Sequence, residues 1–127
     1  MTDEIFGPAV HTYSRAEALD DGVLVDVSGT ARAAGIRFPV ALTRTVWDAY
    51  VEPQGIAGQD VAGRLWDVLW MLRFAIRSGA AGRDRLLFTV RVRMRGRPPY
   101  RRVTLKALCG PGDDVEPVIT VMLPDED

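Results

Sequence analysis

The sequence of 127 residues contains one cysteine, one histidine and one lysine. A single cysteine, Cys109, excludes a disulfide within the chain and suits a reducing compartment. With one histidine besides, a structural zinc site of the usual kind cannot be built. No apolar run approaches the ~20 residues that a membrane-spanning helix needs. The acidic start "MTDEIFGPAV" lacks a signal-peptide pattern. These absences predict a cytoplasmic protein without a membrane partner.

Common catalytic signatures are missing as well: GxxxxGK[ST], GxGxxG after a strand, HExxH, CxxC and GxSxG. We therefore expect no cofactor. One enzyme alternative remains, a small hydrolase or nuclease in which His11 transfers protons together with Asp26 or Tyr13. The simpler interpretation is that His11 is partly buried and bonded to a backbone carbonyl. Cys109 would need a basic neighbour to act as a nucleophile, and we expect a small buried core residue instead.

The turn "GPGDD" and the residues after it carry three acids, Asp113, Asp114 and Glu116. Their oxygens could hold a divalent cation. They lack the ligand spacing of a calcium loop, and acids are ordinary turn residues. We therefore expect turn acids and no metal.

Composition predicts one globular domain, because 47% of residues are apolar and 26% are charged. Alternating or continuous apolar runs predict an antiparallel sheet of three to four strands at approximately 23–27, 86–95, 102–109 and 117–123. The last of these is apolar on both faces, so we expect it inside the sheet, between the 86–109 hairpin and strand 23–27. A long helix over approximately 60–77 would cover the sheet. The predicted class is α+β with two layers and short N-terminal helices.

Short polar residues predict where helices begin. Ser14 followed by Glu17 forms a capping box. Thr43 can cap a helix over 44–51, and Asp60 can cap the long helix.

Glycine and proline predict where elements end. Gly22 and Gly35 suit the left-handed ends of two short helices, of which the second would be capped by Ser28 or Thr30. Pro39 removes a ladder donor, so "IRFPVALT" is expected to be an edge strand or a loop.

The long helix is apolar on two sides. At 100° per residue, one broad stripe faces the core and comprises Val61, Leu65, Val68, Leu69, Leu72, Ala75 and Ile76. Trp66, Trp70 and Phe74 form a second stripe roughly opposite, which we call the aromatic stripe. Arg64, Asp67 and Arg73 occupy the flanks.

Three large aromatic side chains are costly to leave in water. We expect the first fifty residues, which include Ile5, Phe6, Trp47 and Tyr50, to cover the aromatic stripe. The alternative is a homodimer or partner interface, where tryptophan is enriched.

Charge is strongly segregated along the chain. The net charge is −1, but residues 83–106 hold nine basic residues and one acid, a sum of +8, whereas the remainder sums to −9. The predicted hairpin gathers a set that we call the arginine face: Arg91, Arg93, Arg95, Arg97, Tyr100, Arg101, Arg102 and Lys106. A GC-rich genome would also favour arginine over lysine.

The arginine face has three interpretations. It can dock an acidic protein, or it can neutralise phosphates of a nucleic acid while Tyr100 stacks on a base. The ordinary alternative is a solvated sheet face balanced by nearby acids. Like charges opposite each other on a sheet are destabilising, which favours a negative partner.

Three segments together are familiar: "IFGPAVHTYSRAEALDDGVLVDVS", "GRLWDVLWMLRFA" and "VTLKALCGPGDDVEPVITVMLPDED". The chain resembles a family of small uncharacterised proteins carried by bacterial plasmids, phages and other mobile elements. The resemblance implies no catalytic residues. It implies an accessory protein that binds host machinery, with inhibition of a host defence system as one hypothesis. We therefore expect a non-enzymatic protein that binds a macromolecular partner, preferably a protein.

Overall fold

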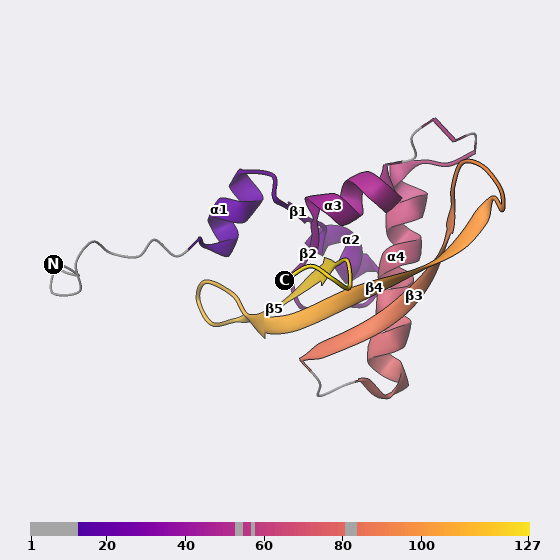
Figure 1. Ribbon diagram of the computed structural model, residues 1–127. Coiled ribbons are helices and arrows are strands. Elements are labelled where there is room, and N and C mark those ends of the chain that lie inside the picture. Colours follow the sequence, from indigo (N-terminus) through magenta and orange to yellow (C-terminus); the bar gives the residue numbers. More distant parts are fainter. Residues whose placement is uncertain (1–12, 53–54, 57, 81–83) are drawn as a thin grey trace, which may run out of the picture.

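The computed structural model describes residues 13–52, 55–56, 58–80 and 84–127 (Figure 1). Within these ranges, five strands form one sheet: β1 (Leu24–Asp26), β2 (Val40–Thr43), β3 (Arg85–Arg93), β4 (Tyr100–Pro111) and β5 (Pro117–Met122). The helices are α1 (Arg15–Asp20), α2 (Ser28–Ala33), α3 (Arg44–Val46) and α4 (Val61–Ala75). Two π-helical turns, η1 (Trp47–Val51) and η2 (Ile76–Ala80), continue α3 and α4.

The sheet is mixed, with the strand order β1-β2-β5-β4-β3. β2 and β5 are parallel, and the other neighbouring strands are antiparallel. The α+β class is confirmed, and the prediction of three to four antiparallel strands fits in part, because the sheet has a fifth strand and one parallel pair among antiparallel ones. β5 is an interior strand as predicted, but its second neighbour is β2 and not the strand at 23–27.

The missed strand β2 begins directly after Pro39. The carbonyl of Pro39 accepts a hydrogen bond from the amide of Ile119 at 2.9 Å, so the residue takes part in pairing through its oxygen. Val40, Ala41 and Leu42 are buried. Proline is tolerated at the first position of a strand or just before it, and the expected edge strand or loop is therefore an interior strand.

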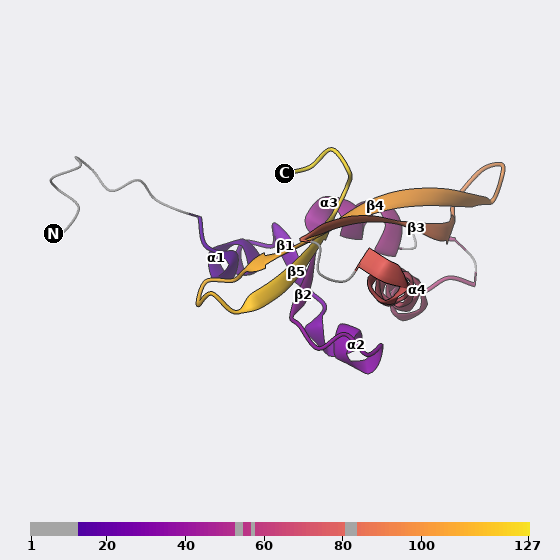
Figure 2. The ribbon, with the colours of Figure 1, turned by 90° about the horizontal axis from the view of Figure 1, so that it is seen from below.

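Helix α4 covers one face of the sheet, where it packs mainly on β3. Phe88, Val90 and Val92 of β3 point toward it and are buried, as the alternation predicts. Figure 2 shows α4 and α2 on the same side of the sheet, and these two helices are in contact. The core therefore lies between the sheet and this helical layer.

Most of the predicted caps are present. Ser14 Oγ accepts from the Glu17 amide and Glu17 Oε1 accepts from the Ser14 amide, both at 3.0 Å. Asp60 Oδ1 accepts from the Gly63 amide at 2.7 Å. Gly22 and Gly35 have φ of 79° and 95°, the left-handed conformation that ends a helix.

The predicted cap of α2 is wrong. Neither Ser28 nor Thr30 caps it, since the N-cap residue is Val27 and makes no side-chain cap bond. Ser28 Oγ instead donates to Asp26 Oδ1 at 2.6 Å, because a short hydroxyl readily closes a local turn with a preceding aspartate.

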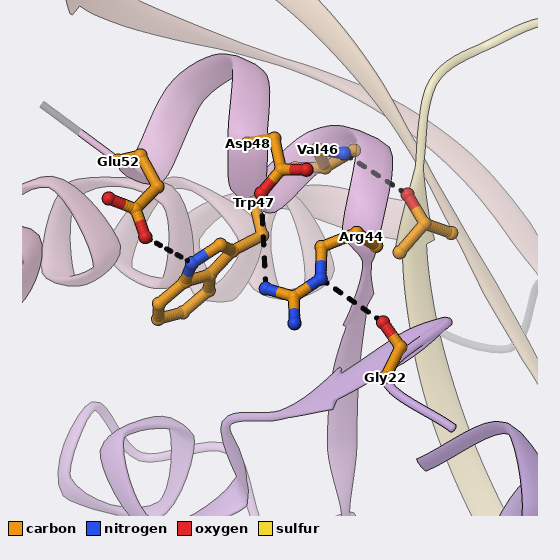
Figure 3. A network of polar contacts seen from close by, with 7 residues as sticks. Gly22, Arg44, Val46, Trp47, Asp48 and Glu52 are labelled. Atoms are coloured by element: carbon orange, nitrogen blue, oxygen red, sulfur yellow. Dashed lines mark hydrogen bonds and ion pairs between the residues drawn. The ribbon is translucent and has the colours of Figure 1, made fainter. Parts of the chain in front are cut away.

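The helical segment over 44–51 is held by polar contacts at both ends (Figure 3). Thr43 Oγ1 caps it by accepting from the Val46 amide at 3.3 Å. Arg44 Nε donates to the carbonyl of Gly22 at 3.2 Å, and Trp47 Nε1 donates to Glu52 Oε1 at 3.1 Å. The bond from Arg44 to Gly22 fixes the segment against the chain that enters β1, and the other two stabilise its own ends.

Candidate functional site

The distal half of the β3–β4 hairpin carries the arginine face. Register places Arg91 opposite Arg102 and Arg93 opposite Tyr100. The guanidinium carbons of Arg91 and Arg93 lie 4.7 and 5.5 Å from the centroid of the Tyr100 ring. Arg93 Nη1 also donates to the Tyr100 hydroxyl at 3.3 Å. Two cations therefore already engage the aromatic ring that the sequence offers for base stacking.

Acids of the described residues form no ion pairs with the exposed arginines of this face. Arg91, Arg95, Arg97, Arg101 and Arg102 are exposed. None of them forms an ion pair with an acid in the part of the chain that the structure describes. Directly opposed cations such as Arg91 and Arg102 repel each other across the strands. The interpretation as a solvated face balanced by nearby acids, without direct ion pairs, stays a prediction.

Lys106 does not belong to the exposed surface, contrary to the prediction. It is 6% exposed, and its Nζ donates to the carbonyl of Glu126. The segment around Glu126 covers Lys106. The Glu126 carboxylate holds this segment in place by accepting from Thr43 Oγ1 at 2.9 Å and from the Leu123 amide at 2.8 Å. The C-terminal segment folds back over the strand, which the alternation of β4 could not indicate.

The aromatic stripe is exposed. Trp66, Trp70 and Phe74 have 38%, 43% and 61% of their surface accessible. The two indoles stack with centroids 5.8 Å apart, and the Arg73 guanidinium lies 4.6 Å from the Trp70 ring. Among the described residues, none covers the stripe fully, and it forms an exposed apolar surface on the outer side of α4.

The expected cover by the first fifty residues is wrong for residues 13–50. Trp47 and Tyr50 pack against the core instead of the stripe. Ile5 and Phe6 lie outside the described residues. A homodimer through the aromatic stripe stays a prediction.

Sequence reasoning missed the role of Arg64, which it placed on a flank of α4. The side chain is 5% exposed and joins three segments. Its guanidinium donates to the carbonyls of Tyr50 at 2.9 Å and Arg93 at 2.8 Å, and to Gln59 Oε1 at 3.2 Å. Burial lowers the pKa of Arg64, while the carboxylate of Asp67 acts in the opposite direction. Arg64 thereby positions the end of β3 from which the arginine face extends.

The catalytic alternative is not assembled by the residues described. His11 lies outside them. Asp26 is exposed, and its carboxylate accepts from the amide and hydroxyl of Ser28. The Tyr13 hydroxyl donates to Asp21 Oδ2 at 2.7 Å, which raises the pKa of Tyr13 to about 12. Cys109 is half-buried at the margin of the core.

The acidic turn serves the fold. Asp113 accepts from the backbone amides of Arg15 and Ala16, each at 2.9 Å, and these bonds lower the pKa of Asp113. Glu116 Oε1 accepts from the Asp114 amide at 2.9 Å. No three His, Cys, Asp or Glu side chains gather into a metal-binding group within the described ranges. Asp113 instead attaches the start of α1 to the β4–β5 turn.

The hydrogen bonds of Asp113 to the start of α1 should depend on pH. Because the folded-state pKa of Asp113 is lowered, its contribution to stability is present above the unfolded value of about 4 and is lost as pH falls through the folded value. We expect the amide NMR signals of Arg15 and Ala16 to shift on acidification below that range. Asp113→Ala should shift them at neutral pH, whereas Asp114→Ala should leave them in place. Unmoved signals in Asp113→Ala would contradict the attachment.

The fold and its exposed arginines define an α+β protein with one strongly cationic surface. The chain belongs to a family of unknown function (DUF6573), whose model matches residues 4–127. Comparison with curated proteins gives no significant match, and comparison with solved structures gives none either. Across the described ranges, every helix is too short or too polar to cross a membrane.

Proposed function

We propose that this protein is a non-enzymatic binding protein that recognises an acidic protein partner through the arginine face. The observation that carries the proposal is the set of exposed arginines without acidic partners among the described residues. The absence of the common catalytic motifs from the sequence supports a binding role. The exposed aromatic stripe offers a second contact surface, since aromatic residues are enriched in interface cores.

Two observations favour a protein over a nucleic acid. The Tyr100 ring is already engaged by Arg91 and Arg93, which leaves it poorly placed to stack on a base. Outside residues 83–106 the chain sums to −9, a charge that repels phosphates. A local acidic patch on a protein meets less of this repulsion than an extended polyanion does.

The resemblance to proteins of plasmids and phages supports a finer proposal. The chain would be an accessory protein of a mobile element, and its partner would be a component of the host. Inhibition of a host defence system is the role that this context favours.

Charge reversal tests the proposal. The variant R91E/R93E/R95E should lose the partners that the wild-type protein captures from a bacterial host lysate, because three reversals cancel the positive charge of the three arginines that remain on this face. The control R32E/R37E/R77E changes the charge equally at three other exposed arginines and should retain them. Circular dichroism should show both variants folded.

Equal capture by both variants would refute the proposal. A titration with duplex DNA provides the competing test. Binding that falls steeply with salt and is lost in R91E/R93E/R95E would assign the face to nucleic acid instead.

A further inference from the structure

The outer edge of β3 is unpaired. Among the described strands, β3 has β4 on one side and no strand on the other (Figure 1). The Met94 amide donates to the Pro99 carbonyl and the Cys109 amide to the Asp84 carbonyl, each at 2.7 Å. Residues 84 and 94 therefore direct their peptide groups toward β4, and so do the even-numbered residues between them. The odd-numbered residues direct theirs outward.

Most of these outward peptide groups have no hydrogen-bond partner among the described residues. The carbonyl of Arg93 is taken by Arg64 Nη1 at 2.8 Å, which closes one end of the edge. The outward groups of the other odd-numbered positions meet no hydrogen-bonding group in the part of the chain that the structure describes: Arg85, Leu87, Thr89 and Arg91. Four consecutive alternate residues therefore offer a row of donors and acceptors to solvent.

Side chains along this edge alternate with the sheet faces and place arginines on either side of an exposed leucine. The same odd-numbered residues point away from α4, so the edge presents Arg85, Leu87, Thr89, Arg91 and Arg93 on one face of the sheet. Leu87 is 57% exposed, and the arginines on either side of it have no acidic partner among the described residues. Opposite-charge and apolar cross-strand pairs stabilise neighbouring strands. The edge thus fits a strand with acids at alternate positions and one apolar residue.

We propose that β3 accepts an acidic extended segment of a partner protein as an added antiparallel strand. The inference rests on the proposed function, whose partner it describes more closely. The segment places acids opposite Arg85, Arg91 and Arg93 and an apolar side chain opposite Leu87. Its backbone completes the outward hydrogen bonds of β3, the recognition mode in which affinity comes from the main chain and specificity from alternate side chains.

The other occupants fit less well. A nucleic acid backbone supplies acceptors for the amides, but its phosphates supply no donors for the outward carbonyls. A second copy would bring a strand with three arginines and no acid against an identical strand. Like charges on an edge strand are a device that opposes such self-pairing.

The probe is the acetylated and amidated peptide ETETTTVTE, which matches residues 93 to 85 in antiparallel register. With wild-type protein, we expect hydrogen exchange of the Leu87, Thr89 and Arg91 amides to slow by about tenfold or more on saturation, because new hydrogen bonds protect them. The control peptide KTKTTTVTK should give no protection. Protection by both peptides or by neither would overturn the proposal.

Thr89→Pro separates strand addition from charge. The Thr89 amide points outward, so proline removes no bond to β4, and edge strands tolerate proline in this position. Thr89→Pro should weaken peptide binding by about tenfold or more, whereas Thr89→Val should bind like wild type, because only the first loses the outward donor. If both bind equally while R91E/R93E/R95E does not, strand addition is wrong and the proposed function survives.

Two further measurements keep the test decisive. If Thr89→Pro unfolds, the peptide methylated on the nitrogen of its fifth residue replaces it, since that residue lies opposite Thr89 and can no longer donate. Unchanged binding of the methylated peptide would overturn the proposal. A wild-type dimer in sedimentation, with the same β3 amides protected without peptide, would also overturn it in favour of a second copy.

Discussion

Arg64→Met is expected to lower the free energy of unfolding by about 3 kcal/mol, because it leaves buried acceptors without their charged donor. The guanidinium of Arg64 donates to the carbonyls of Tyr50 and Arg93, which belong to two different segments. Methionine keeps most of the apolar stem and removes the donors. The loss should therefore reflect hydrogen bonding more than packing. Urea denaturation measures it.

Two controls define this result. Arg64→Lys keeps the charge but replaces a planar fork by a point donor, so we expect an intermediate loss. Arg32→Met removes an exposed arginine and should change stability by less than about 0.5 kcal/mol. If Arg64→Met proves as mild as Arg32→Met, the junction between α4, η1 and β3 does not depend on Arg64.

Leu42→Ala is expected to cost about 3 kcal/mol, the usual range for a fully buried leucine. Leu42 has no accessible surface and lies on β2. It pairs with Val25 of β1 on one side and with Val121 of β5 on the other. The deleted methyl groups leave a cavity in the core on the face of the sheet, and close-packed neighbours relax into it incompletely. Thermal or urea unfolding measures the loss.

A leucine at the sheet margin supplies the matched control. Leu87→Ala removes the same atoms from a side chain that is mostly exposed and should cost less than about 0.5 kcal/mol. The comparison distinguishes the interior strand from the edge strand or loop that Pro39 predicts. If Leu42→Ala costs about as little stability as Leu87→Ala, the interior position of β2 is wrong.

Local signals in the sequence predicted local structure well. The capping box of Ser14 and Glu17, the cap at Asp60 and the alternation of β3 each depend on residues a few positions apart. Hydrogen bonds and periodicity act over that range, so these elements were predictable one by one. The exposure of Arg91 and Arg102 follows from the same alternation.

Arrangements that depend on distant residues were not predictable in this way. The parallel pairing of β2 with β5 joins segments about eighty positions apart, and Pro39 concealed it. Lys106 was placed outward by alternation, but residues twenty positions later cover it. Arg64 was placed on a helix flank, where no pattern reveals that two carbonyls from other segments converge on its guanidinium. In each case tertiary packing overrode the local rule.

The position of β5 has a consequence for synthesis of the chain. Among the described strands, β5 is the one that joins the β1–β2 pair to the β3–β4 pair, and it follows all the others in sequence. Two-stranded units are marginally stable by themselves. The ribosome therefore delivers the connecting strand after both halves, so the two pairs cannot join into one sheet until residues 117–122 emerge. The sheet is therefore completed from its middle and not from an edge.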